Sequence, residues 1–136
     1  MLIPADHAWA GKRQIAPGDL LDEPLLMLGA GNCFRDQVLD LCARAGRGGP
    51  RVLEGSGLET IRHMVASGVG VTVMPASAVD GIGENEPLLR VKPFPDPQPA
   101  RRVGLVWRAS FPRHAAVDVL RQALLDAHLP GTSPVE

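Results

Sequence analysis

The residues of this chain best suited to chemistry are its two cysteines, which lie close together in the stretch GNCFRDQVLDLC, residues 31–42. Thiols bind metals, form disulfides or act as redox-reactive nucleophiles. A zinc site is not expected, because the chain has no CxxC pair and its histidines are scattered. The four histidines, all expected on the surface or in loops, are His7, His63, His114 and His128. We therefore expect no metal and no cofactor.

Cys33 and Cys42 belong to a segment, residues 33–45, in which apolar residues recur at helical spacings. Asn32 is a good N-cap for this helix and Gly46 a good C-terminal stop. Nine residues turn a helix by about 900° and advance it by about 13.5 Å, so the two thiols point to opposite faces. A disulfide needs Cα atoms within about 7 Å. A bond between the two cysteines therefore requires the helix to unwind, at least in part.

The two thiols are expected to differ in reactivity. Cys33 falls at the first helical position, where the backbone amides and the helix dipole favour a thiolate, and Arg35 follows two residues later. Cys42 lies in mid-helix beside leucines, an apolar setting that favours the neutral thiol. This difference suggests that an oxidant attacks Cys33 first. The resulting sulfenic acid can then condense with a second thiol. The spacing leaves open a plainer interpretation, in which both cysteines are small hydrophobic residues without a redox role.

Short strands and helices alternate along the chain. Strands are predicted at residues 24–28, 51–54, 70–75, 88–91 and 102–107, and residues 1–4 fit the end of another. Helices are predicted at 33–45, at 56–68 with a capping box from Ser56 to Glu59, and at 110–128, with one helical turn at 17–21. This order predicts an α/β fold with a mostly parallel sheet and helices on its faces. The last strand and helix find no partner unit near the N-terminus, so Leu120 and Leu124 should be exposed.

The composition excludes several classes of protein. A chain of 136 residues suffices for one domain with a real core. Its net charge is −1 and it has no long basic run, so it shows no electrostatic footprint for nucleic acid. No apolar stretch is long enough to span a membrane, and residues 1–13 do not have the pattern of a secretory signal. We therefore expect a cytoplasmic location without membrane contact.

Three stretches carry a family resemblance: LLMLGAGNCFRDQVLDLC, GSGLETIRHMVASGVGVTVMP and RRVGLVWR. They resemble the regulatory domain of LysR-type transcriptional regulators, and in particular the OxyR family of hydrogen-peroxide-inducible activators. The similarity runs from about Leu2 to about Leu129, and the paired cysteines at the family's spacing are its most specific part. The resemblance implies the periplasmic-binding-protein-like α/β effector fold. Residues 1–101 would form regulatory subdomain II, with the crossover at the N-terminus. Residues 102–129 would form the returning strand and helix of an incomplete subdomain I, and 130–136 a disordered tail.

The resemblance also implies roles for individual residues. Cys33 falls on the family's peroxide-reactive cysteine and Cys42 on its disulfide partner. Arg102 falls on an arginine that the family places near the reactive thiol, and Arg35 and Asp36 also match. The chain departs from the family at two positions. Asn32 and Val52 stand where the family commonly has histidines, and neither can carry a proton or a positive charge.

The function that the resemblance implies is redox sensing. Hydrogen peroxide would oxidise Cys33, Cys42 would close a reversible disulfide, and the 33–45 helix would refold. A glutaredoxin-like or thioredoxin-like reductant would reset the disulfide, so the chain would not be an enzyme. By this resemblance, the intact protein would be a homo-oligomer, a dimer, and would bind DNA only through an N-terminal domain that this fragment lacks.

Other functions remain open at this stage. The chain would be an effector-binding domain for a small organic ligand if its cysteines were passive. It would be a thiol-peroxidase-like enzyme if it turned over with a reductant. It would be a non-functional truncated remnant if the incomplete subdomain I left it without a working partner.

Overall fold

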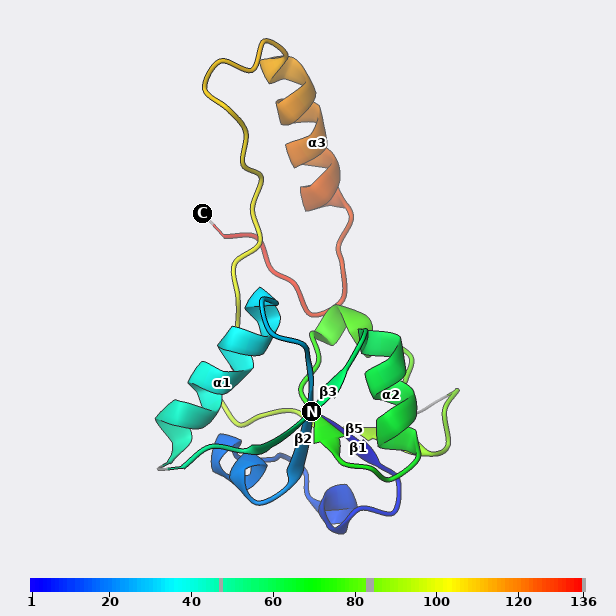
Figure 1. Ribbon diagram of the computed structural model, residues 1–136. Coiled ribbons are helices and arrows are strands. Elements are labelled where there is room, and N and C mark those ends of the chain that lie inside the picture. Colours follow the sequence, from blue (N-terminus) through cyan, green and yellow to red (C-terminus); the bar gives the residue numbers. More distant parts are fainter. Residues whose placement is uncertain (47, 83–84, 136) are drawn as a thin grey trace. The chain divides into compact units, whose positions relative to one another are not determined.

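A five-stranded sheet forms the centre of the structure, a computed structural model that describes residues 1–46, 48–82 and 85–135 (Figure 1). The strands are β1 (Leu2–Pro4), β2 (Pro24–Leu28), β3 (Arg51–Gly55), β4 (Val71–Thr72) and β5 (Leu89–Val91). Their order across the sheet is β3-β2-β4-β1-β5. β2 pairs in parallel with β3 and β4, whereas β1 runs antiparallel to β4 and β5. The predicted α/β sheet is thus a mixed one: β2 pairs only in parallel, whereas β1 runs against its two neighbours.

Helices connect the strands and cover both faces of this sheet. They are α1 (Cys33–Ala45), α2 (Leu58–Ala66) and the short 3-10 helices η1 (Ala8–Gly11), η2 (Pro17–Leu21) and η3 (Ala76–Ala78). The predicted bounds of α1 are confirmed, and α2 is shorter than predicted. The capping box predicted for α2 is wrong: Gly57 is the N-cap, and the Ser56 hydroxyl lies 3.3 Å from the Thr60 hydroxyl. The chain enters α2 one residue later than the box requires.

Successive side chains of β2 point to opposite faces of the sheet, so the hydrophobic core consists of two layers. On one face, Leu25 and Met27 of β2 pack with Val38 and Cys42 of α1, in a cluster that also contains Trp9. On the other face, the next residue of the strand, Leu26, packs with Ile61 and Val65 of α2. Successive strand residues point to opposite faces, so β2 holds a helix on each side. α1 and α2 accordingly flank the sheet in Figure 1.

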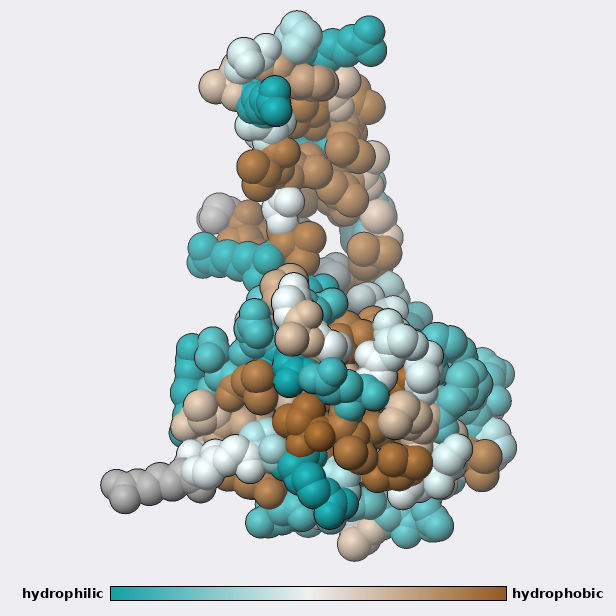
Figure 2. Space-filling model, in the orientation of Figure 1, coloured by the Kyte–Doolittle hydropathy of each residue, from teal (hydrophilic) through white to brown (hydrophobic). Residues whose placement is uncertain are grey.

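The chain divides into two compact units, Met1–Pro99 and Ala100–Glu136, and the sheet lies wholly in the first. The second unit contains α3 (His114–Asp126), in which no described residue is buried. Leu120 and Leu124 are each half exposed, which confirms the exposed apolar face predicted for this helix. Figure 2 shows apolar side chains gathered over it.

The strand predicted at 102–107 is wrong. None of these residues is in a strand, and Val103 and Val106 are 83% and 96% exposed. A strand requires a neighbouring backbone to satisfy its hydrogen bonds. All five strands of the described sheet lie before residue 100, so this apolar stretch pairs with none of them.

Candidate redox site on α1

The amino end of α1 presents Cys33 to solvent. Asn32 has extended backbone angles and its Oδ1 accepts a hydrogen bond of 3.0 Å from the Phe34 amide, which makes it the N-cap of the helix. Cys33 follows as the first helical residue and is exposed. The first amides of a helix lack partners within the helix and favour negative charge beside them. An exposed thiol at this position is accessible to a small oxidant.

The second cysteine occupies the opposite environment. Cys42 is 1% exposed and belongs to the apolar cluster between α1 and the sheet. Burial raises the pKa of the Cys42 thiol above its ordinary value of 9.0, because the thiolate would lose its hydration. Both cysteines are free thiols in the structure. The burial of Cys42 agrees with the apolar setting predicted for it, whereas the predicted reactivity of Cys33 stays a prediction.

Arg35 ties the first turn of α1 to the sheet. Its Nη1 donates hydrogen bonds of 2.9 Å to the carbonyl oxygen of Leu28, at the end of β2, and of 2.7 Å to Oε1 of Glu54 in β3. The Arg35 side chain is only 16% exposed, whereas that of Glu54 is 55% exposed. The guanidinium therefore bridges a helix and two strands, and both of these acceptors belong to the sheet.

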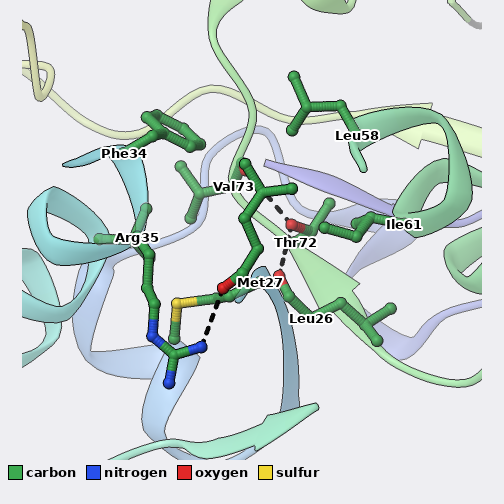
Figure 3. Close-up of a pocket in the computed structure, with 10 residues that line it drawn as sticks. Leu26, Met27, Phe34, Arg35, Leu58, Ile61, Thr72 and Val73 are labelled. Atoms are coloured by element: carbon green, nitrogen blue, oxygen red, sulfur yellow. Dashed lines mark hydrogen bonds between the residues drawn. The ribbon is translucent and has the colours of Figure 1, made fainter. Parts of the chain in front are cut away.

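A small cavity of about 10 Å³ lies beside this contact, between α1, α2 and the sheet (Figure 3). Its lining includes Phe34 and Arg35 from α1, Ile61 from α2 and Thr72 from β4. The Thr72 hydroxyl is satisfied by a hydrogen bond of 2.7 Å to the Leu26 carbonyl. This volume holds one water-sized molecule. An organic ligand therefore finds no enclosed site here.

The other predicted site residues lie apart from these contacts. Asp36 is exposed in the first turn of α1, where its charge complements the helix dipole. Arg102 is exposed in the second unit, so its predicted place near the reactive thiol stays a prediction. Val52 lies partly buried in β3, opposite Leu25 of β2. It packs against the core cluster rather than offering a polar group.

Sequence reasoning missed Glu54. Its carboxylate reaches an arginine nineteen positions away because β3 pairs with β2 in the register that sets Leu28 opposite Gly55. The sequence does contain a weak signal, since an acidic residue near the end of a short strand lies at the sheet edge where a helix begins. The register that brings the charges together is a tertiary property.

The described residues contain neither a metal-binding cluster nor a membrane-spanning helix. No group of three or more histidine, cysteine, aspartate or glutamate side chains there is placed to hold a metal ion. Within the same residues, no helix is long and apolar enough to cross a membrane.

Comparison with known families agrees with this fold. The model of the LysR substrate binding domain matches residues 1–128. The chain therefore belongs to the LysR substrate-binding domain family.

Within that family its relatives are hydrogen-peroxide-inducible gene activators. The chain is 36% identical over 131 residues to the DNA-binding transcriptional dual regulator OxyR of Escherichia coli K12, covering 94% of this chain and 43% of that protein. It is 40% identical over 114 residues to a probable hydrogen peroxide-inducible genes activator of Mycobacterium avium, covering 83% of this chain and 36% of the relative. The chain thus spans well under half the length of these relatives.

Solved structures of OxyR regulatory domains have the same fold. The reduced form from Pseudomonas aeruginosa superposes with a TM-score of 0.79 at 50% identity, covering 90% of this chain and 58% of that one. A reduced form from N. meningitidis has a TM-score of 0.85 at 37% identity, covering 99% of this chain and 62% of that one. The predicted fold class, that of a LysR effector domain, is confirmed, apart from the strand at 102–107.

Proposed function

We propose that this chain is the peroxide-sensing regulatory module of a LysR-type transcription regulator, and that it signals through a reversible Cys33–Cys42 disulfide. The observation that carries the proposal is the contrast within α1: one thiol is exposed at the helix N-terminus and the other is buried in the core. The homology to hydrogen-peroxide-inducible activators supports hydrogen peroxide as the oxidant.

The first step takes place at Cys33. Its thiolate sulfur attacks one oxygen of hydrogen peroxide, the O–O bond breaks, and the departing hydroxide takes a proton to become water. Cys33 becomes a sulfenic acid, so the sulfur loses two electrons and the peroxide gains them. The solvent-exposed position at the amino end of α1 lets the peroxide approach without any movement of the core.

The second step requires α1 to unwind. Across an intact helix the two cysteines are about 13.5 Å apart along the axis and on opposite faces. When Cys42 leaves the core, the desolvation that raised its pKa is relieved, so the thiol becomes a better nucleophile. Its sulfur attacks that of Cys33, the S–O bond breaks, and water leaves with the Cys42 proton. The new bond then holds residues 33–42 in a non-helical conformation.

The rest of the cycle belongs to the whole regulator. A dithiol reductant, glutaredoxin-like or thioredoxin-like, would attack the disulfide and return both thiols, so the chain acts as a switch rather than as an enzyme. A relative is described as DNA-binding. For the intact protein we propose DNA binding through a domain outside this chain, homo-oligomerisation, and a location in the cytoplasm.

Peroxide titration followed by mass spectrometry tests the proposal. One equivalent of hydrogen peroxide should lower the mass of the chain by two hydrogens, about 2 Da, and yield a linked peptide that joins Cys33 to Cys42. Cys33→Ser should abolish both signals. Cys42→Ser should instead accumulate a Cys33 sulfenic acid, trapped by dimedone. Absence of the linked peptide in the unaltered chain would contradict the sensor function.

A further inference from the structure

We propose that Glu54 is a positioning residue of this switch: through its ion pair with Arg35 it holds the first turn of α1 on the sheet and so opposes disulfide formation. The inference rests on the proposed function and names a residue that controls the same site. Glu54 lies in β3, whereas both cysteines and Arg35 lie in α1. It acts on the thiols without touching the reacting atoms.

The geometry gives Arg35 two acceptors on the sheet. Oε1 of Glu54 lies 2.7 Å from Nη1 of Arg35, and the same nitrogen lies 2.9 Å from the Leu28 carbonyl oxygen. The Leu28 carbonyl fixes where the guanidinium reaches the edge of β2. The Glu54 carboxylate then supplies the opposite charge that the partly buried guanidinium needs.

This contact exists only while α1 is helical at its start. Arg35 is two residues from Cys33 and seven from Cys42, so it lies inside the segment that the disulfide must close. Unwinding that segment carries the Arg35 backbone away from its helical position and separates its guanidinium from Glu54. The ion pair therefore stabilises the dithiol state and is lost in the disulfide state.

The exposure of Glu54 sets how strongly its ion pair with Arg35 can oppose disulfide formation. Because the Glu54 carboxylate is 55% exposed, solvent screens the pair, and such pairs are worth a fraction of a kcal/mol. Removing the charge should raise the equilibrium constant for disulfide formation by about two- to fivefold. It should also make that constant less dependent on salt, since salt weakens an exposed ion pair.

The measurement is a redox titration of the full chain in glutathione buffers. The protein dithiol and one glutathione disulfide give the protein disulfide and two molecules of glutathione, so two electrons and two protons pass to the glutathione disulfide. Free thiols are alkylated after acid quenching, and the oxidised fraction is read by mass spectrometry. The expected result for Glu54→Gln is a midpoint at a lower ratio of oxidised to reduced glutathione than for the unaltered chain.

The matched control is Glu59→Gln. Glu59 also pairs with an arginine, Arg62, but both lie on α2. This substitution removes the same charge from the same unit without loosening α1, so the midpoint should not move. An equal shift in Glu59→Gln would overturn the inference, because it would trace the effect to net charge.

A double-mutant cycle separates action through Arg35 from a general loss of stability. In an Arg35→Gln background, Glu54→Gln should cause no further shift of the midpoint. If Arg35→Gln does not fold, as judged by circular dichroism, Arg35→Lys at an ionic strength of about 0.5 M serves as the background in which the pair is weakened. An undiminished effect of Glu54→Gln in either background would overturn the inference. If the unaltered chain forms no Cys33–Cys42 disulfide, the proposed function itself fails, which is a distinguishable result.

Discussion

α1 and α3 are both thirteen residues long and both carry an apolar stripe, but the stripe of α1 is buried and that of α3 is exposed to solvent. α1 buries Val38 and Cys42 against the sheet, whereas no described residue of α3 is buried. Periodicity determines which side chains share a helix face, but it does not supply the surface that covers that face. The apolar face of α1 is covered by strands and loops that precede residue 100. This surface makes Cys42 a core residue.

The largest expected effect comes from the surface beneath α1. Leu25 of β2 is fully buried in the cluster that contains Cys42. Leu25→Ala should lower the free energy of unfolding by about 2–5 kcal/mol, because it removes buried methyl groups and leaves a cavity. Urea unfolding followed by circular dichroism measures the change. A loss below about 1 kcal/mol would mean that α1 is not docked on this cluster and would remove the contrast with α3.

A smaller loss is expected at the cap of α1. Asn32→Ala removes the side-chain acceptor of the Phe34 amide and should cost about 1 kcal/mol. Asn32→Asp keeps an acceptor at the same position and should retain most of the stability. Thermal melts of both variants in reducing buffer make the comparison. Equal melting temperatures for the two would show that the cap does not stabilise the helix.

A pH effect should distinguish the buried thiol. Burial raises the pKa of Cys42, so the unfolded chain releases its thiol proton at a lower pH than the folded chain does. The contribution to stability is fully present below pH 9.0, the ordinary value, and is lost as the pH rises through the folded pKa. Unfolding free energies measured from pH 7 to pH 10 should therefore decline more steeply in the unaltered chain than in Cys42→Ala, and parallel curves would contradict the burial of this thiol.

The smallest expected effect on stability is at α3. Leu120 is half exposed, so Leu120→Ser should change the free energy of unfolding by no more than about 0.5 kcal/mol. The same substitution should reduce self-association, because it breaks an exposed apolar stripe. Sedimentation velocity and urea unfolding of the same sample measure both quantities. A loss of stability like that of Leu25→Ala would show that the face of α3 is covered in solution.

The sequence predicted elements better than it predicted their partners. Local signals sufficed for β2 and α1, because an apolar run between turn residues and a capped amphipathic stripe are properties of neighbouring residues. The antiparallel insertion of β1 depends on pairing with β5, almost ninety positions away, and no local signal encodes it. The apolar stretch 102–107 has the composition of a strand, but a strand exists only where another backbone accepts its hydrogen bonds.

In the candidate site, too, features that depend on neighbouring residues were predictable and those that depend on strand pairing were not. The sequence predicted that the two thiols point to opposite faces of one helix and that Cys42 has apolar surroundings, and the burial of Cys42 agrees with this. The link from Arg35 to Glu54 depends on how β3 registers with β2, so the sequence could not reveal it.

The two tryptophans of the chain allow the difference in burial between its two units to be followed by intrinsic fluorescence. Trp9 is 8% exposed in the same cluster as Cys42, and Trp107 is 48% exposed in the second unit. Indole emission shifts to longer wavelength as water reaches the ring. In Trp107→Phe, the remaining fluorophore is Trp9, which belongs to the apolar cluster that also contains Cys42. Under the proposed switch, the emission of Trp9 should record continuously and without a label the opening and closing of the core as oxidant and reductant are added in turn.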